Sequence, residues 1–187
     1  SVLEMFAEEH HCSRRYLMRL NPTVAWNEIT PGIRVKLPNT ALPRPKGTAE
    51  LIHIQLAQRT LDVYDGATNL VARFPCSIAT RMDKQPVGRL EITNVAEAAD
   101  YTFDPVRFPT SPEAAARSGK LTIPPGPNNP VGTTWMSLSR SGYGIHGTPD
   151  PEKIGRTTSL GCFRLSNWNA EHLVKMVRVG TVVLVDR

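Results

Sequence analysis

Proline restricts the fold of this chain more than any other residue. The sequence holds 16 prolines and 13 glycines in 187 residues, whereas proline usually makes up about 5% of a protein. Proline fixes φ and lacks a backbone N–H, so it interrupts helices and central strands. We therefore expect a fold of mixed, mainly β class, with short strands and many turns.

Length and hydropathy set further limits. With 40% hydrophobic residues, the chain can build one core and a small additional unit, and its composition excludes collagen-like, coiled-coil and wholly disordered structures. The apolar run Val182–Val185 near the C-terminus is far shorter than the ~20 residues of a membrane span. Nothing at Ser1 resembles a signal peptide. We expect no membrane span.

The positive charge is modest and dispersed. The net charge is +5, and the only adjacent basic pair is Arg14-Arg15. Such a chain suits an anionic surface such as a cell wall, and it carries no recognisable nucleic-acid-binding motif. We therefore expect no nucleic acid among its partners.

Residues 1–40 predict a small N-terminal unit of two helices and one strand. Apolar residues recur at helical spacing behind Ser1 and again after Ser13. A Pro31-Gly32 turn precedes an alternating segment, residues 33–37, that is typical of a half-buried strand. Residues 41–49 contain two prolines and little apolar content, which predicts a semi-rigid linker.

From residue 50 onwards the hydrophobic period changes to two. Apolar residues alternate over 52–56, 61–63 and 72–78, which predicts three consecutive strands with a turn at Asp65-Gly66. Cys76 falls on such an alternating face and is most simply a buried small hydrophobe, as is Cys12 in the N-terminal unit. A disulfide between these two cysteines remains an open alternative.

The second half combines a proline-rich stretch with a compact pattern of strand, loop and helix. Seven prolines between 101 and 130 predict a long, stiff loop that borders a site. A strand is expected to end at His146, a helix to begin after Ser166 with an apolar face of Leu173, Met176 and Val177, and a final strand to cover 181–186.

A histidine and a cysteine bound the loop between that strand and helix. His146 and Cys162 could form a nucleophile and base, because a cysteine attacks as thiolate and a neighbouring imidazole can take its proton. Gly161 would allow a sharp turn whose N–H groups hold an oxyanion. The planar guanidinium of Arg164 could bind a substrate carboxylate.

Two other readings of these residues are open. A buried cysteine and a hydrogen-bonded histidine are commoner than a catalytic dyad. A zinc site could instead use His146, Cys162 and His172, although structural zinc sites usually have four ligands in closely spaced pairs, and the sequence has neither Cys-x-x-Cys nor His-x-x-x-His.

Residues 50–187 resemble the L,D-transpeptidase catalytic domain of the YkuD type. The resemblance rests on His146-Gly147 followed by Ser159-x-Gly161-Cys162-x-Arg164, and on three earlier segments in the same order: Pro86-x-Gly88, the run 124–132, and 142–147. It implies a β-sandwich-like mixed fold, a periplasmic or cell-wall location, no cofactor, and acyl transfer on peptidoglycan stem peptides. Carbapenem β-lactams would be inhibitors.

The resemblance also implies roles for individual residues. Cys162 would be the nucleophile and His146 the general base and acid. Ser159 and the backbone of Gly161 and Cys162 would orient the pair and hold the oxyanion. Gly147 would permit close approach, and Arg164 would bind substrate carboxylate or shape the turn. Purely structural support is an equal alternative for Ser159 and Arg164, and Tyr143 is expected in the pocket wall.

The chain departs from the family pattern at two positions. Leu160 stands where the family has a histidine before Gly-Cys, and Asn169 where an aspartate is frequent. Two alternatives to the transpeptidase therefore stay open: an L,D-carboxypeptidase that uses water as acceptor, and a catalytically silent wall-binding protein.

The N-terminal unit resembles a LysM peptidoglycan-binding repeat. The likeness rests on residues 17–22, Pro31-Gly32 and Leu37-Pro38. It implies two helices packed on a two-stranded sheet, with glycan as ligand. The first strand of such a repeat would precede Ser1. A helical cap without a ligand is the alternative.

Overall fold

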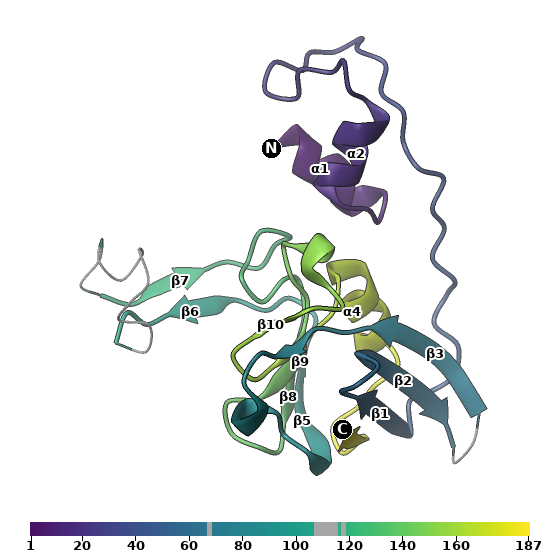
Figure 1. Cartoon of the computed structure of the whole chain (residues 1–187), viewed down its shortest axis with the longest axis vertical. Helices are drawn as coiled ribbons and strands as arrows, with labels where there is room; N and C mark the ends of the chain where they lie inside the picture. Colours follow the sequence, from purple (N-terminus) through teal and green to yellow (C-terminus); the bar gives the residue numbers. More distant parts are fainter. Residues whose placement is uncertain (67–68, 107–115, 117–118) are drawn as a thin grey trace.

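A curled sheet forms the body of the protein. The computed structural model describes residues 1–66, 69–106, 116 and 119–187. Within them, one 8-stranded sheet has the order β11-β9-β8-β5-β12-β1-β2-β3 (Figure 1). Its strands are β1 (Leu51–Gln55), β2 (Thr60–Asp65), β3 (Asn69–Pro75), β5 (Gly88–Ala96), β8 (Trp135–Leu138), β9 (Gly144–His146), β11 (Phe163–Arg164) and β12 (Val182–Asp186).

Smaller elements surround this sheet. Two two-stranded sheets pair β4 (Ile78–Ala79) with β10 (Thr157–Ser159) and β6 (Tyr101–Phe103) with β7 (Leu121–Ile123). The helices are α1 (Val2–Glu9), α2 (Arg14–Leu20), α4 (Asn167–Val174) and the 3₁₀ turns η1 (Met82–Lys84) and η2 (Pro151–Lys153). No helix of the described residues is long and apolar enough to cross a membrane.

The alternating segments form the strands that their pattern predicts. β1, β2 and β3 make an antiparallel meander, and β12 pairs in parallel with β1. Inward-facing residues such as Ile52, Ile54, Leu61 and Val183 are fully buried in one core, together with Leu173 of α4. Cys76 is also buried in this core, and all three cysteines are free.

Strand β5 divides the sheet into two parts. Its first half pairs with β12, and its second half pairs with β8 after a register shift between Ile92 and Asn94. Such irregularities increase local twist and bend a strand. The bend turns β8 and β9 away from the meander (Figure 1). Strand β11 pairs with β9, and these three strands carry the candidate site.

Three expectations from the sequence are wrong in part. Residues 33–37 form no strand, and residues 1–50 contain two helices and no sheet. Instead, the side-chain amide of Asn21 donates to the C=O of Lys36 and accepts from its N–H. The stretch 101–130 is not wholly irregular, because β6 and β7 pair there, although 107–115 and 117–118 lie outside the described residues. Helix α4 ends at Val174, so Met176 and Val177 pack on the core from beyond its end.

The N-terminal helices contact the part of the chain that follows β9. Ser1 caps α1 in a capping box with Glu4, and Ser13 caps α2, as predicted. An extended segment then leads to β1 along one side of the molecule (Figure 1). Arg14 pairs with Asp150 at 3.3 Å, and the rings of His11 and Trp168 lie 5.9 Å apart. The helical unit is therefore anchored near the loop that follows β9.

Candidate active site

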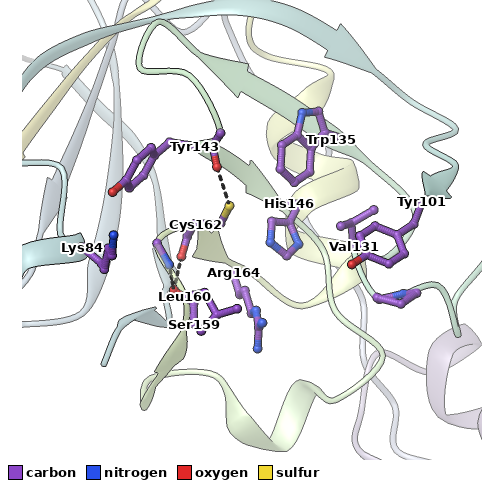
Figure 2. Close-up of a pocket in the computed structure, with 13 residues that line it drawn as sticks. Lys84, Tyr101, Val131, Trp135, Tyr143, His146, Ser159, Leu160, Cys162 and Arg164 are labelled. Atoms are coloured by element: carbon purple, nitrogen blue, oxygen red, sulfur yellow. Dashed lines mark hydrogen bonds between the residues drawn. The ribbon is translucent and has the colours of Figure 1, made fainter. Parts of the chain in front are cut away.

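Parallel pairing of β11 with β9 brings the histidine and the cysteine together. His146 is the last residue of β9 and is in register with Arg164 of β11, and Cys162 directly precedes β11. The register places Cys162 beside Gly144, two residues before His146, so residues 16 apart in sequence lie on the same face of the strand pair. The side chains of His146 and Cys162 both reach the same pocket (Figure 2).

The pocket is cationic. It has a volume of about 450 Å³. Among the described residues, its lining includes two cations, Lys84 and Arg164, and no acidic side chain. The remaining residues that line it are Tyr101, Pro130, Val131, Trp135, Gly142, Tyr143, His146, Ser159, Leu160, Gly161 and Cys162. Such a pocket favours a ligand with carboxylate groups.

The Cys162 side chain is half-buried. Its Sγ donates to the carbonyl oxygen of Gly142 at 3.8 Å (Figure 2). Burial raises the pKa of this thiol, and the backbone of Gly144 and the positive charge of Arg164 act in the opposite direction. At neutral pH the thiol is thus protonated, and it needs a base when it attacks.

His146 is placed to be that base. Its Nδ1 lies 2.7 Å from the carbonyl oxygen of Gly147. A carbonyl can only accept, so this contact assigns a hydrogen to Nδ1. A weaker bond to the backbone of Val131 also holds the ring. Burial, with a smaller contribution from Arg164, lowers the pKa of His146 to about 4. The imidazole is therefore neutral, and ready to take a proton, at physiological pH.

Ser159 organises the turn before the nucleophile. Its hydroxyl donates to the carbonyl oxygen of Cys162 at 2.6 Å and accepts from the N–H of Gly161 at 3.2 Å. Because the Gly161 N–H is already bonded, it is not the group that would hold an oxyanion in this conformation. Gly161 is not in the left-handed region either. A Cβ there would lie 3.0 Å from Cε1 of Tyr143, so this glycine gives Tyr143 room in the pocket wall.

Gly147 is a point of close packing. A Cβ on Gly147 would collide with Oδ1 of Asn167, and a Cβ on Gly132 would meet the same oxygen. Asn167 is fully buried, and its Oδ1 accepts from the N–H of Thr133 at 3.3 Å. This amide thus fixes the backbone that follows His146.

The other predicted residues occupy different places. His172 lies edge-on to Phe74, with ring centroids 5.5 Å apart, and lines another groove, so it does not converge with His146 and Cys162 on a metal. Leu160 lines the pocket and is 74% exposed. In the described residues, no group of three or more acidic, histidine or cysteine side chains is arranged to hold a metal ion.

Sequence reasoning missed several pocket residues. Trp135, Lys84 and Tyr101 come from β8, η1 and β6, which are remote in sequence from the His–Cys loop. No motif marks them. Asn167 directly follows the predicted helix cap Ser166 and is the first residue of α4, and no motif marks its contact with Gly147.

Comparison with known proteins now places the chain in a family. Residues 49–185 match the YkuD family model, the L,D-transpeptidase catalytic domain, and the chain belongs to this family. It is 27% identical over 184 residues to a Bacillus licheniformis protein named as the L,D-transpeptidase YkuD, covering 98% of this chain and 93% of that protein.

Solved structures share the fold. An L,D-transpeptidase from Mycobacterium smegmatis matches with a TM-score of 0.56 and 22% identity, over 74% of this chain and 59% of that one. An L,D-transpeptidase in complex with imipenem matches with a TM-score of 0.55 and 18% identity, over 75% and 60%. The present chain thus spans about three fifths of these two solved chains.

Proposed function

We propose that this protein is a peptidoglycan L,D-transpeptidase that works through a covalent acyl-cysteine. The observation that carries the proposal is that the Cys162 thiol and the buried imidazole of His146 line the same pocket. Membership of the L,D-transpeptidase catalytic family supports the reaction type. The acyl donor would be a tetrapeptide stem, and the acceptor an amine of a neighbouring stem.

The first half-reaction would form the acyl-enzyme. His146 Nε2 takes the proton of Cys162 as Sγ attacks the carbonyl carbon of the third residue of the stem. The tetrahedral intermediate then collapses, the C–N bond breaks, and His146 returns the proton to the leaving amine of D-alanine. With the Gly161 N–H engaged by Ser159, the backbone N–H of Cys162 is our candidate oxyanion donor.

The second half-reaction would reverse these roles. The acceptor amine attacks the thioester carbonyl while His146 removes one of its protons. The C–S bond breaks, the proton passes to the thiolate of Cys162, and a new amide cross-link is released. No oxidant or cofactor enters this balance.

The cationic pocket supports an anionic donor. Lys84 and Arg164 both line it, and carboxylates of a stem peptide or of a carbapenem would be attracted to them. Such substrates would place the protein in the periplasm or at the cell wall. The LysM assignment of the N-terminal unit, and glycan binding by it, remain predictions.

Intact-mass spectrometry with imipenem tests the proposal. We expect one adduct per chain, retained in Cys12→Ser and absent in Cys162→Ser; an adduct that persists in Cys162→Ser would refute Cys162 as nucleophile. Incubation with a disaccharide-tetrapeptide then identifies the reaction. Cross-linked dimers support the transpeptidase, trimmed monomers indicate a carboxypeptidase, and unchanged substrate indicates a silent binder.

A further inference from the structure

A tryptophan lies flat against the candidate general base. Trp135 of β8 is the register partner of His146 of β9 in an antiparallel pair, so both side chains lie on the same face of the sheet. The ring centroids are 5.1 Å apart and the planes are inclined by only 20°. Figure 2 shows the indole above the imidazole at the edge of the pocket.

The indole is held in this orientation from two sides. Its Nε1–H donates to Oγ of Ser137 at 2.9 Å, two residues along the same strand. Gly144, the register partner of Ser137, lies against the ring, where a Cβ would be 2.6 Å from Cζ2 of Trp135. A larger residue at 144 would therefore displace the indole. The contact is built into the strand pair and does not depend on a mobile loop.

This geometry matters because His146 must carry a charge during the reaction. After it takes the thiol proton, the ring is an imidazolium in a buried position, with the cation Arg164 nearby. Burial and a like charge both disfavour that state. The face of an aromatic ring carries partial negative charge and stabilises a cation placed over it, by an amount equivalent to about 2- to 30-fold in an equilibrium constant.

We propose that Trp135 is a positioning residue for the general base: it fixes the plane of His146 and stabilises the imidazolium that forms when Cys162 gives up its proton. The Gly147 carbonyl holds the Nδ1 edge of the ring, and Trp135 holds its face. Two contacts in different directions leave the ring little rotational freedom at the wall of the pocket that it lines. This inference rests on the proposed acyl-transfer function.

Substitutions at residue 135 separate the aromatic face from simple bulk. Trp135→Phe keeps a π face, whereas Trp135→Leu fills part of the space without one; Trp26→Leu, in the N-terminal unit, is the control for loss of a tryptophan. We expect imipenem acylation to fall by about 2- to 5-fold in Trp135→Phe and by about 10- to 100-fold in Trp135→Leu. In Trp135→Leu the acid limb of the pH profile should lie at lower pH than in Trp135→Phe, because the imidazolium has lost its aromatic partner.

A second measurement does not require turnover. NMR titration of His146 should give a lower pKa in Trp135→Leu than in Trp135→Phe, which tests the stack even in a protein that fails to acylate. If wild type does not acylate, this result counts against the proposed function, and the titration still decides whether Trp135 stabilises the imidazolium. Equal rates and equal His146 titration in Trp135→Leu and wild type would overturn the inference.

The Leu variant could fail to fold, which circular dichroism would show. Ser137→Ala then decides the question, because it removes only the hydrogen bond that fixes the indole. We expect acylation to fall by about 2- to 5-fold and the His146 titration to move. An unchanged rate together with an unchanged titration in Ser137→Ala would refute the positioning role.

Discussion

The side-chain amide of Asn167 donates a hydrogen bond to Oε2 of Glu8 at 3.3 Å. This contact joins helix α1 to the first residue of α4. The same amide donates to the carbonyl oxygen of Pro127 at 3.2 Å, and its oxygen packs against Gly147 beside the general base. The N-terminal helices are thereby connected to the backbone of the active site through one buried side chain.

The first prediction concerns the ionisation of Glu8. Burial is the main cause that raises its pKa to about 7, and the nearby charge of Glu171 adds to this. A raised carboxyl pKa means that the folded state prefers the proton, so this group's contribution to stability is fullest below pH 4.5 and is lost as pH rises through 7. Glu8→Gln, which can still accept from Asn167, should raise the melting temperature at pH 8 by about 2–4 °C and change it little at pH 5.

Glu9→Gln is the matched control for this experiment. Glu9 lies on the same helix and is exposed, and its change to Gln removes the same formal charge. Its melting temperature should follow that of wild type at both pH values. A stabilisation of Glu9→Gln equal to that of Glu8→Gln would assign the effect to net charge and contradict the burial argument.

The second prediction concerns Arg14, which links the helical unit to the loop after His146. Its guanidinium contacts Glu4 at 2.8 Å and Asp150 at 3.3 Å. From sequence, the N-terminal unit is expected to serve substrate capture and to leave the chemistry unaffected. The contacts lead us to expect that Arg14→Ala slows imipenem acylation by about 2- to 5-fold, whereas Arg15→Ala does not.

Removal of residues 1–45 extends this test. It should weaken retention on peptidoglycan sacculi if the unit binds glycan, and it should slow acylation by about 3- to 10-fold because Asn167 loses Glu8. Unchanged acylation in the truncated protein and in Arg14→Ala would show that the helices are an independent attachment, as the sequence alone suggested.

Local patterns predicted the parts of the fold that local physics decides. The alternation over 52–56 and 72–78 determines which residues enter the core, and the Ser1 and Ser13 caps determine where the helices begin. The segment 33–37 alternates equally well but forms no strand. A strand needs a partner for its backbone groups, and Asn21 supplies side-chain hydrogen bonds there instead.

The residues of the site also fall into two groups, those that a local motif marks and those that only tertiary packing brings together. His146, Cys162 and Ser159 lie in one short stretch whose spacing and motif mark them as functional. Trp135 reaches the pocket only because β8 pairs with β9, and a pairing register between distant segments has no local signal. Glu8 and Asn167 meet across 159 residues of sequence. Such contacts follow from tertiary packing, so they could not be predicted from sequence patterns.

The third prediction tests Ser159. Its hydroxyl spans the turn by donating to the Cys162 carbonyl and accepting from the Gly161 N–H. Ser159→Ala removes both bonds and should reduce imipenem acylation by about 10- to 100-fold. Ser159→Thr keeps the hydroxyl and should retain most of the rate. Equal activity in Ser159→Ala and Ser159→Thr would show that the turn holds its shape without this side chain.

The fourth prediction uses the charge of Arg164. Its positive charge lowers the pKa of both His146 and Cys162. Arg164→Gln should therefore move the midpoint for iodoacetamide alkylation of Cys162 to higher pH. The acid limb of the pH profile of acylation should also move to higher pH, from its wild-type position near the His146 pKa of about 4.

Two variants control for charge and for structure. Arg164→Lys keeps the cation and should stay close to wild type in both profiles. Lys84→Gln removes the other pocket cation, which is not among the causes of either shift. If Lys84→Gln moved the alkylation midpoint as far as Arg164→Gln does, the total charge of the pocket, and not Arg164 in particular, would set the reactivity of Cys162.

The last prediction concerns Leu160, the position at which the chain departs from the family pattern. Leu160 lines the pocket beside the nucleophile and is 74% exposed. Its apolar surface is available to a substrate, where contact with an apolar group would contribute about 25 cal/mol per Å² buried.

We therefore expect Leu160→His to acylate with imipenem within about fivefold of wild type while changing the ratio of cross-linked to trimmed products from a disaccharide-tetrapeptide. Leu160→Ala is the control that removes the apolar contact without adding a ring. An inert wild type beside an active Leu160→His would instead mean that the exchange has silenced the enzyme, and that this chain binds the wall without modifying it.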